Sequence, residues 1–118
     1  MDNKEQAAPP WGKWLVLDNH GEFKVKRIEV LPGKRLSYQK HSRREEHWYI
    51  VKGRAKVTID GRDHFLEERN CISIDREAFH RIENVGEAPL IFIEVQTGEY
   101  FGEDDIMRAE DDFGRAGT

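Results

Sequence analysis

Four residues from separate segments of the chain could together bind a metal ion: Gln39, His41, Glu46 and His80. Gln39 and His41 are two apart in a predicted strand, so their side chains project from the same face. Glu46 begins the next predicted strand, and His80 lies near the start of a later one. Two imidazoles, a carboxylate and an amide oxygen form a mixed nitrogen and oxygen set that suits zinc, iron, manganese or nickel. The pattern therefore predicts a metal centre built from three strands.

Each of these residues also has a purely structural interpretation. A single histidine on a strand is usually exposed or hydrogen-bonded within a core. Glu46 could be an exposed strand carboxylate, and Gln39 a polar residue on an open sheet face. The joint arrangement, with Gln-x-His on one strand, Glu on the next and His on a later one, is what favours metal binding.

Short strands would have to position these residues. Strands are predicted over residues 14–17, 23–30, 46–51, 55–59, 64–66, 71–74, 79–83 and 90–96, and one more follows the turn at Pro32-Gly33 and ends at His41. Turn-forming Gly, Pro, Asn and Asp separate them. The alternation over 23–30 slips phase between Val25 and Ile28, which predicts a bulge. Helical periodicity is weak and confined to residues 104–108. The pattern favours an all-β fold, an antiparallel sandwich or small barrel.

Length and charge narrow the class of protein. A chain of 118 residues can bury one core, so we expect a single domain over residues 10–118, with a flexible arm over 1–9 and an acidic tail over about 98–118. The net charge of −4 argues against general nucleic-acid binding. No apolar stretch has the length of a signal peptide or a membrane span, which predicts a cytoplasmic protein with no membrane partner. The single Cys71 excludes an intramolecular disulfide, and its apolar strand context predicts a buried structural thiol.

Several motifs resemble those of a known family. The glycine, Gln-x-His, glutamate and glycine of Gly33, Gln39-Lys40-His41, Glu46 and Gly53 resemble the first cupin motif, with Gln39 in place of its first histidine. That exchange is characteristic of the phosphomannose isomerase branch, and residues 10–12, 23–26, 80–84, 93–96 and 98–106 match this branch as well. The chain resembles the type II mannose-6-phosphate isomerase domain of the cupin superfamily. The resemblance implies a double-stranded β-helix, or jelly-roll barrel, that holds a divalent metal ion, with zinc the first choice and manganese, iron or nickel as alternatives.

The activity that the resemblance implies is the interconversion of mannose 6-phosphate and fructose 6-phosphate. Such an isomerase moves a proton between C1 and C2, so it needs a metal to polarise the carbonyl and a base within reach of the proton. Candidates for the base are Glu94, His47 and Lys40, and the sequence does not choose among them. His47 has the opposite parity to Glu46 and is expected to face away from the metal. Glu94 lies in an otherwise apolar strand, where an unpaired carboxylate would be costly.

The phosphate of such a substrate needs cationic groups, preferably arginine. Arg44 is the first candidate because it matches the branch motif and lies between the predicted metal strands. Arg35 shares the parity of Gln39 and His41, so it could line the same cavity. Trp48 shares the parity of Glu46 and could form a wall of the cavity or pack in the core.

The second cupin motif departs from the family pattern. Arg69, Asp75 and Glu77 fall where glycine, proline and glycine are expected. Since residues with a Cβ do not adopt positive φ cheaply, the loop is expected to reach His80 by a different backbone path.

Two other functions stay open from the sequence alone. One is a non-catalytic metal- and sugar-binding module. The other is a different metal-dependent cupin enzyme such as a dioxygenase, against which Gln39 counts. Exposed edge strands of a jelly roll invite pairing between copies, so a homodimer is expected.

Overall fold

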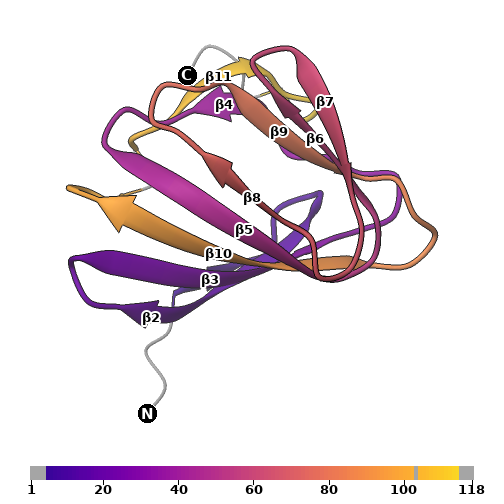
Figure 1. Ribbon diagram of the computed structural model, residues 1–118, viewed down its shortest axis with the longest axis horizontal. Helices are drawn as coiled ribbons and strands as arrows, with labels where there is room; N and C mark the ends of the chain where they lie inside the picture. The colour runs from indigo at the N-terminus through magenta and orange to yellow at the C-terminus, as the bar shows by residue number, and fades with distance from the viewer. Residues whose placement is uncertain (1–4, 103, 115–118) are drawn as a thin grey trace.

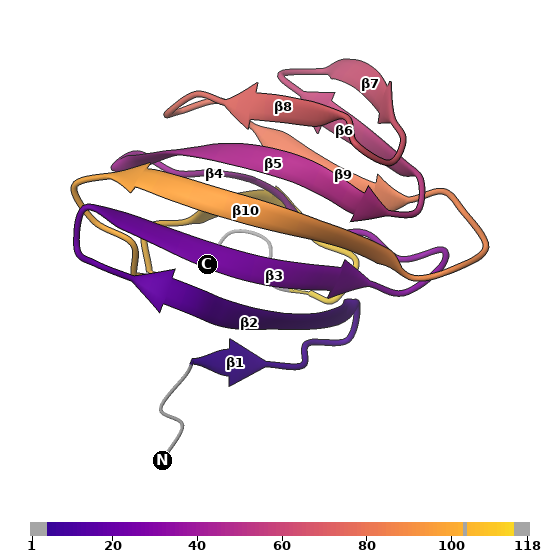
Figure 2. The same cartoon turned by 60° about the horizontal axis from the view of Figure 1, so that its bottom comes forward.

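The protein folds into two antiparallel sheets. The structure is a computed structural model that describes residues 5–102 and 104–114. Its strands are β1 (Gln6–Ala7), β2 (Gly12–Asn19), β3 (Phe23–Val30), β4 (Tyr38–Lys40), β5 (Arg44–Lys52), β6 (Ala55–Ile59), β7 (Arg62–Leu66), β8 (Cys71–Ile74), β9 (His80–Asn84), β10 (Leu90–Gly98) and β11 (Met107–Glu110). One sheet has the order β1-β2-β3-β10-β5-β8 and the other β11-β4-β9-β6-β7, and the two face each other (Figure 1). Figure 2 shows the six-stranded sheet strand by strand.

The three central strands of the six-stranded sheet, β3, β10 and β5, carry the inward rows on which the site depends. Their residues alternate between buried and more exposed positions, as expected of strands with one face on a core. Aligned residues form three successive rows: Ile28, Phe92 and Ile50; then Lys26, Glu94 and Trp48; then Lys24, Gln96 and Glu46. Along the strands, the interior therefore changes from apolar to polar within two residues.

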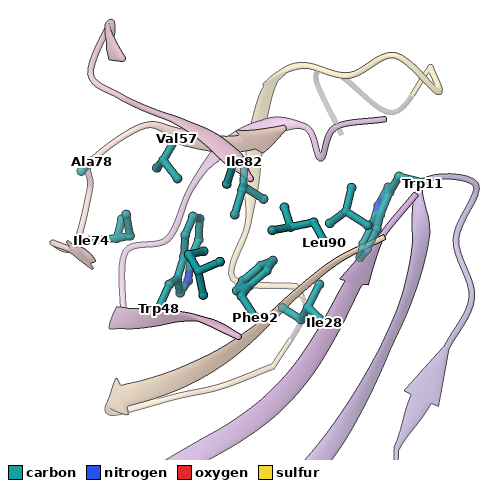
Figure 3. Close-up of a cluster of buried hydrophobic side chains, with 12 residues drawn as sticks. Trp11, Ile28, Trp48, Val57, Ile74, Ala78, Ile82, Leu90 and Phe92 are labelled. Carbon is teal, nitrogen blue, oxygen red and sulfur yellow. The ribbon is translucent and has the colours of Figure 1, made fainter. Parts of the chain in front are cut away.

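The apolar half of the interior is a continuous core between the sheets. Ile28, Phe92 and Trp48 of the six-stranded sheet face Val57 and Ile82 of the other sheet (Figure 3). Burial of these side chains is the main stabilising contribution that the fold makes, at about 1.5–3 kcal/mol for each large apolar side chain. The polar half lies on the same rigid strands and is positioned by this core.

The bulge predicted in β3 is wrong. β3 alternates without interruption, and Lys24 and Lys26 are buried on the same face as Ile28. The register shift lies instead in the neighbouring strand β2, between Val16 and Asp18. The predicted bulge would have placed these lysines on the outer face, because it assumed that the apolar Val25 points inward.

The two ends of the chain also differ from expectation. Residues 104–108 form no helix, and β11 pairs antiparallel with β4 instead, with Met107 opposite Lys40 and Arg108 opposite Gln39. In the expected N-terminal arm, Gln6–Ala7 forms strand β1 on β2, while residues 1–4 lie outside the described residues. The expected acidic tail is described over residues 98–102 and 104–114. None of the described residues forms a helix long and apolar enough to cross a membrane.

Cys71 is exposed rather than buried. It begins β8, the edge strand of the six-stranded sheet, where its side chain falls on the outer face. The prediction of a buried thiol, which rested on the apolar residues around Cys71 in the sequence, is therefore wrong.

The turns before and after β8, which precede His80, keep a glycine-like backbone although they lack the glycines. Arg69 and Glu77 adopt φ values of 75° and 66°. Arg69 N–H donates to the carbonyl of Ile50 at 2.8 Å, and Glu77 N–H donates to the carbonyl of His41 at 2.8 Å. The expectation of a different backbone path is therefore wrong at these two positions, because these hydrogen bonds fix the left-handed conformation in spite of the Cβ.

Replacement of Arg69 by glycine tests the cost of this conformation. Arg69→Gly is expected to raise the free energy of unfolding by roughly 0.5–1 kcal/mol, because the steric cost of positive φ disappears while the unfolded chain gains some freedom. Urea unfolding measures the change, with Arg69→Ala as the matched control that keeps a Cβ and should stay within about 0.5 kcal/mol of the parent. An equal gain in both variants would contradict the explanation.

Candidate metal centre

His41, Glu46 and His80 converge at the polar end of the interior. One ligand atom of each lies within 4.8 Å of the others, and all three side chains are buried. His41 Nε2 is 3.4 Å from Glu46 Oε2, and His80 Nε2 is 3.8 Å from Glu46 Oε1. His41 directly follows β4, Glu46 lies on β5 and His80 begins β9, so three strands from both sheets build the cluster.

Both imidazoles are oriented as metal ligands. His41 Nδ1 lies 2.6 Å from the carbonyl of Asp105, and His80 Nδ1 lies 2.9 Å from the carbonyl of Ala78. Because a carbonyl only accepts, each Nδ1 carries the hydrogen in the neutral ring and each Nε2 keeps its lone pair. The Nε2 of His80 is buried and has no hydrogen-bond partner within the described residues. Burial, followed by Arg44 and His80, lowers the pKa of His41 to about 4, which keeps its ring neutral near pH 7.

This donor set fits a divalent transition-metal ion. Two Nε2 lone pairs and one carboxylate match the nitrogen and oxygen ligation of zinc and of the metals next to it. Binding would also give the buried His80 Nε2 the partner that it lacks within the described residues.

The fourth predicted ligand, Gln39, is placed beside the cluster. Gln39 is the cross-strand partner of His80 on β4 and borders a surface cavity. Its Oε1 accepts a hydrogen bond from Ser37 Oγ at 2.7 Å. An amide oxygen has two lone pairs, so this bond leaves one that could reach an ion, and a ligand role for Gln39 stays a prediction.

Arg44 makes direct contact with two members of the cluster. Its Nε donates to Glu46 Oε2 at 2.9 Å, and its Nη2 lies 3.2 Å from the Nε2 of His41. Arg44 is only 3% exposed, so this guanidinium is held inside the protein beside the ligand atoms.

Glu46 and Glu94 share one donor in the interior. The indole Nε1 of Trp48 donates to Glu46 Oε1 and to Glu94 Oε1, both at 3.1 Å, and Gln96 Nε2 donates to Glu94 Oε2 at 2.7 Å. Burial and the neighbouring Glu46 carboxylate raise the pKa of Glu94 to about 7. Burial works against ionisation of Glu46 as well, but His80 and Arg44 outweigh it and hold its pKa below the ordinary value. The pKa values of the two carboxyl groups are therefore shifted in opposite directions.

A cavity of about 460 Å³ opens beside this cluster, a volume within the range of small-molecule sites. Its charged lining is Lys26, Arg44, Arg108 and Glu94, and the indoles of Trp11 and Trp14 contribute apolar walls. Three cationic side chains against one carboxylate make the cavity suited to an anion that also carries apolar or hydroxylated surface.

Two of the three predicted base candidates, His47 and Lys40, are not brought to the cavity. His47 is exposed on the outer face of β5, with Nδ1 2.8 Å from Ser73 Oγ, as its parity indicated. The Nζ of Lys40 lies 3.4 Å from Glu77 Oε1, on the side of β4 away from the cavity. The structure therefore leaves Glu94 as the one base candidate of the three that borders the cavity.

Arg35 is also outside the site, and Trp48 is internal to the core. Arg35 donates two hydrogen bonds to Asp112, at 2.8 and 2.9 Å, and its guanidinium is partly exposed. Strand alternation wrongly placed Arg35 on the same face as Gln39 and His41, because the regular strand begins only at Tyr38. Trp48 packs against His80 and Phe92 and is not among the residues that line the cavity, so the core interpretation is the correct one.

Two residues that border or support the site, Lys26 and Asp105, were not predicted from the sequence. Lys26 reaches the cavity because β3 has no bulge, and uninterrupted alternation with Ile28 was the signal that could have found it. Asp105 holds the segment after His41, since its carboxylate accepts from the backbone N–H groups of Ser42 and Arg43 at 3.1 and 2.9 Å. Asp105 lies in the run 98–106 that resembles the family, but the sequence did not indicate its role, because its partners lie more than sixty residues earlier in the chain.

Comparison with known proteins places this site in a family. A sequence model described as "Mannose-6-phosphate isomerase C-terminal" matches residues 1–111. The chain belongs to this family. As a member of the mannose-6-phosphate isomerase C-terminal family it carries the cluster on a cupin fold, in agreement with the resemblance seen in its motifs.

The curated relatives are considerably longer proteins. The alginate biosynthesis protein AlgA of Pseudomonas aeruginosa is 49% identical over 113 residues, which cover 96% of this chain and 24% of AlgA. The mannose-1-phosphate guanylyltransferase of Escherichia coli K12 is 49% identical over 106 residues, which cover 90% of this chain and 22% of that protein. The chain thus spans about a quarter of the length of the curated relatives that it matches.

Solved structures of low sequence identity confirm the fold alone. The capsular polysaccharide assembling protein CapF of Staphylococcus aureus superposes with a TM-score of 0.79 at 16% identity, covering 91% of this chain and 34% of CapF. The cupin domain of Cnp3 from Schizosaccharomyces pombe superposes with a TM-score of 0.69 at 16% identity, covering 73% of this chain and 64% of that chain. The predicted all-β cupin barrel is confirmed.

Zinc binding should stabilise the protein through His80. Zn²⁺ at a hundredfold excess over its dissociation constant is expected to raise the melting temperature by roughly 10 °C, since such binding adds about 2.7 kcal/mol. His80→Gln should lose most of this shift, while His47→Gln, the same substitution at an exposed histidine, should keep it. Differential scanning fluorimetry after chelation and after reloading measures the shift. Equal shifts in both variants would contradict the assignment.

Proposed function

We propose that this domain is a metal-dependent isomerase that interconverts mannose 6-phosphate and fructose 6-phosphate. The observation that carries the proposal is the buried cluster of His41, Glu46 and His80, which lies beside a cationic cavity that Glu94 borders. Membership of the mannose-6-phosphate isomerase C-terminal family supports the same activity. Each part of the site then has a chemical task in moving a proton between two carbons of a phosphorylated sugar.

The metal would be held by His41, Glu46 and His80, with Gln39 as the proposed fourth ligand. When bound, a divalent ion polarises the sugar carbonyl and stabilises negative charge on its oxygen. The protein fixes the ligands in advance: the carbonyls of Asp105 and Ala78 orient the two imidazoles. This orientation lowers the reorganisation needed when substrate arrives.

Glu94 is the proposed base. Its carboxylate removes the proton from C2 of the open-chain aldose and returns it to C1, while the proton of the C2 hydroxyl passes to the oxygen on C1, so the ketose forms by redistribution of two hydrogens with no net oxidation. Trp48 and Gln96 each donate a hydrogen bond to Glu94, at 3.1 and 2.7 Å, and so hold the carboxylate at the cavity wall. A fixed position matters because a base acts only within hydrogen-bond reach of the proton that it transfers.

The phosphate is proposed to bind among Lys26, Arg44 and Arg108. All three border the cavity and approach it from different strands, β3, β5 and β11. Arginine binds phosphate oxygens in a bidentate fashion, and lysine adds a compact charge. Trp11 and Trp14 supply flat apolar surface against which a sugar ring can lie.

The proposal includes the identity of the metal, the compartment and the assembly of the protein. Zinc is the proposed ion, since two imidazoles and a carboxylate are a common zinc ligand set. The cytoplasm is the proposed compartment, and the free Cys71 is consistent with reducing conditions.

A homodimer is the proposed assembly, supported by the exposed Phe65 on the edge strand β7. Light scattering on a column at micromolar concentration tests the dimer, and a monomer mass would contradict it.

The activity is tested with mannose 6-phosphate in an assay for fructose 6-phosphate. We expect turnover that is abolished by chelation and restored by added metal. Glu94→Gln should lower kcat at least about a hundredfold, because general-base catalysis contributes that much or more. His47→Gln is the control and should keep parental kcat, since His47 lies on the outer face. Full activity in Glu94→Gln would remove Glu94 from the mechanism, and absence of turnover by the metal-loaded parent would refute the proposed function.

A further inference from the structure

Arg44 engages the atoms that a metal ion would use. His41 Nε2 has a single lone pair, and the Nη2 of Arg44 lies 3.2 Å from it. Glu46 Oε2 accepts from the Nε of Arg44 at 2.9 Å. One guanidinium thus bridges two of the three cluster residues from inside the protein.

An ion and this guanidinium cannot use His41 at the same time. The lone pair of His41 Nε2 is directed either to an N–H of Arg44 or to a metal. A divalent ion would also repel the positive charge of Arg44 at this range, and the buried surroundings screen that repulsion weakly. Metal binding to His41 therefore requires the end of the Arg44 side chain to move.

The cavity offers space into which the Arg44 side chain could rotate. Arg44 already borders the cavity together with Lys26 and Arg108, and its Nη1 donates to the carbonyl of Gly102 at 3.4 Å. A rotation of the side chain away from His41 would bring the guanidinium among these other cations. An anion bound in the cavity would attract the guanidinium toward itself, so it would favour the moved position.

We propose that Arg44 is an exchangeable cation that links metal loading to anion binding. It bridges His41 and Glu46 until a divalent ion displaces it, and it then contributes to binding of a phosphoryl group in the cavity. Metal and anion each favour the same position of Arg44, so each must tighten binding of the other by an equal factor. The identity of the anion as a sugar phosphate rests on the proposed function, whereas the competition between Arg44 and the metal does not.

The metal half of this proposal is tested by the Zn²⁺ affinity of variants, measured by competition with a chromogenic chelator. Arg44→Gln is expected to bind Zn²⁺ at least about tenfold more tightly than the parent, because the competing cation is gone. Arg108→Gln is the matched control: it removes a cation that borders the cavity from another strand, β11, and it should change the affinity less than about threefold. An unchanged or weaker affinity in Arg44→Gln, or an equal gain in Arg108→Gln, overturns the competition.

The coupling half is tested on the parent protein, so it does not depend on a variant that folds. Sulfate, a soluble analogue of the phosphoryl group, is titrated by calorimetry at constant ionic strength into chelated and Zn²⁺-loaded protein. We expect at least about fivefold tighter sulfate binding to the loaded form. Arg44→Lys, which keeps the charge but cannot bridge two acceptors in the same way, should reduce this ratio. Equal sulfate affinities in the two forms of the parent, or an unchanged ratio in Arg44→Lys, overturn the coupling.

Neither measurement requires turnover. Loss of the isomerase activity with retained competition and coupling would refute the proposed function alone. Isomerase activity with no competition would refute this inference alone.

Discussion

The polar end of the barrel depends on the buried carboxylate of Glu46. Burial of an isolated carboxylate is expensive, and it is tolerated only where charge and hydrogen bonds compensate it. Glu46 receives the guanidinium of Arg44 on one oxygen and the indole N–H of Trp48 on the other, with His41 and His80 nearby. The groups around Glu46 follow from this requirement, since its charge attracts cations and Glu94 shares the indole N–H of Trp48 with it.

The site is held rigidly because it shares its strands with the apolar core. In the aligned rows of β3, β10 and β5, a step of two residues leads from Phe92 to Glu94 and another to Gln96. The core residues cannot shift without moving the polar rows, and Trp48 belongs to both regions through its ring and its N–H. Packing of the core thereby sets the distances between the groups that would bind metal and substrate, which is the kind of support that a precise site requires.

Much of the fold and half of the site could be predicted from the sequence, and the failures have physical causes. The strands and the His41, Glu46 and His80 cluster follow from alternation and motif spacing, which are local properties. Lys26 was missed because a charged residue in an inward position contradicts simple alternation, and the conflict was wrongly resolved as a bulge. Arg35 was misplaced because parity holds only inside a strand. The contact of Asp105 with the segment after His41 joins residues distant in the chain, and no local rule reports it.

In the loop that leads into His80, Glu77 adopts a strained backbone conformation but makes side-chain contacts that a glycine could not make. A glycine at position 77 would adopt φ near 66° without strain, yet it could offer no side chain. Glu77 accepts from Ser42 Oγ at 3.3 Å and pairs with Lys40 at 3.4 Å, while its N–H donates to the carbonyl of His41. These three contacts all reach the segment that carries His41. The loop before one imidazole therefore braces the other, and the strain at this position supports the site, because it is offset by interactions that fix the separation of the two rings.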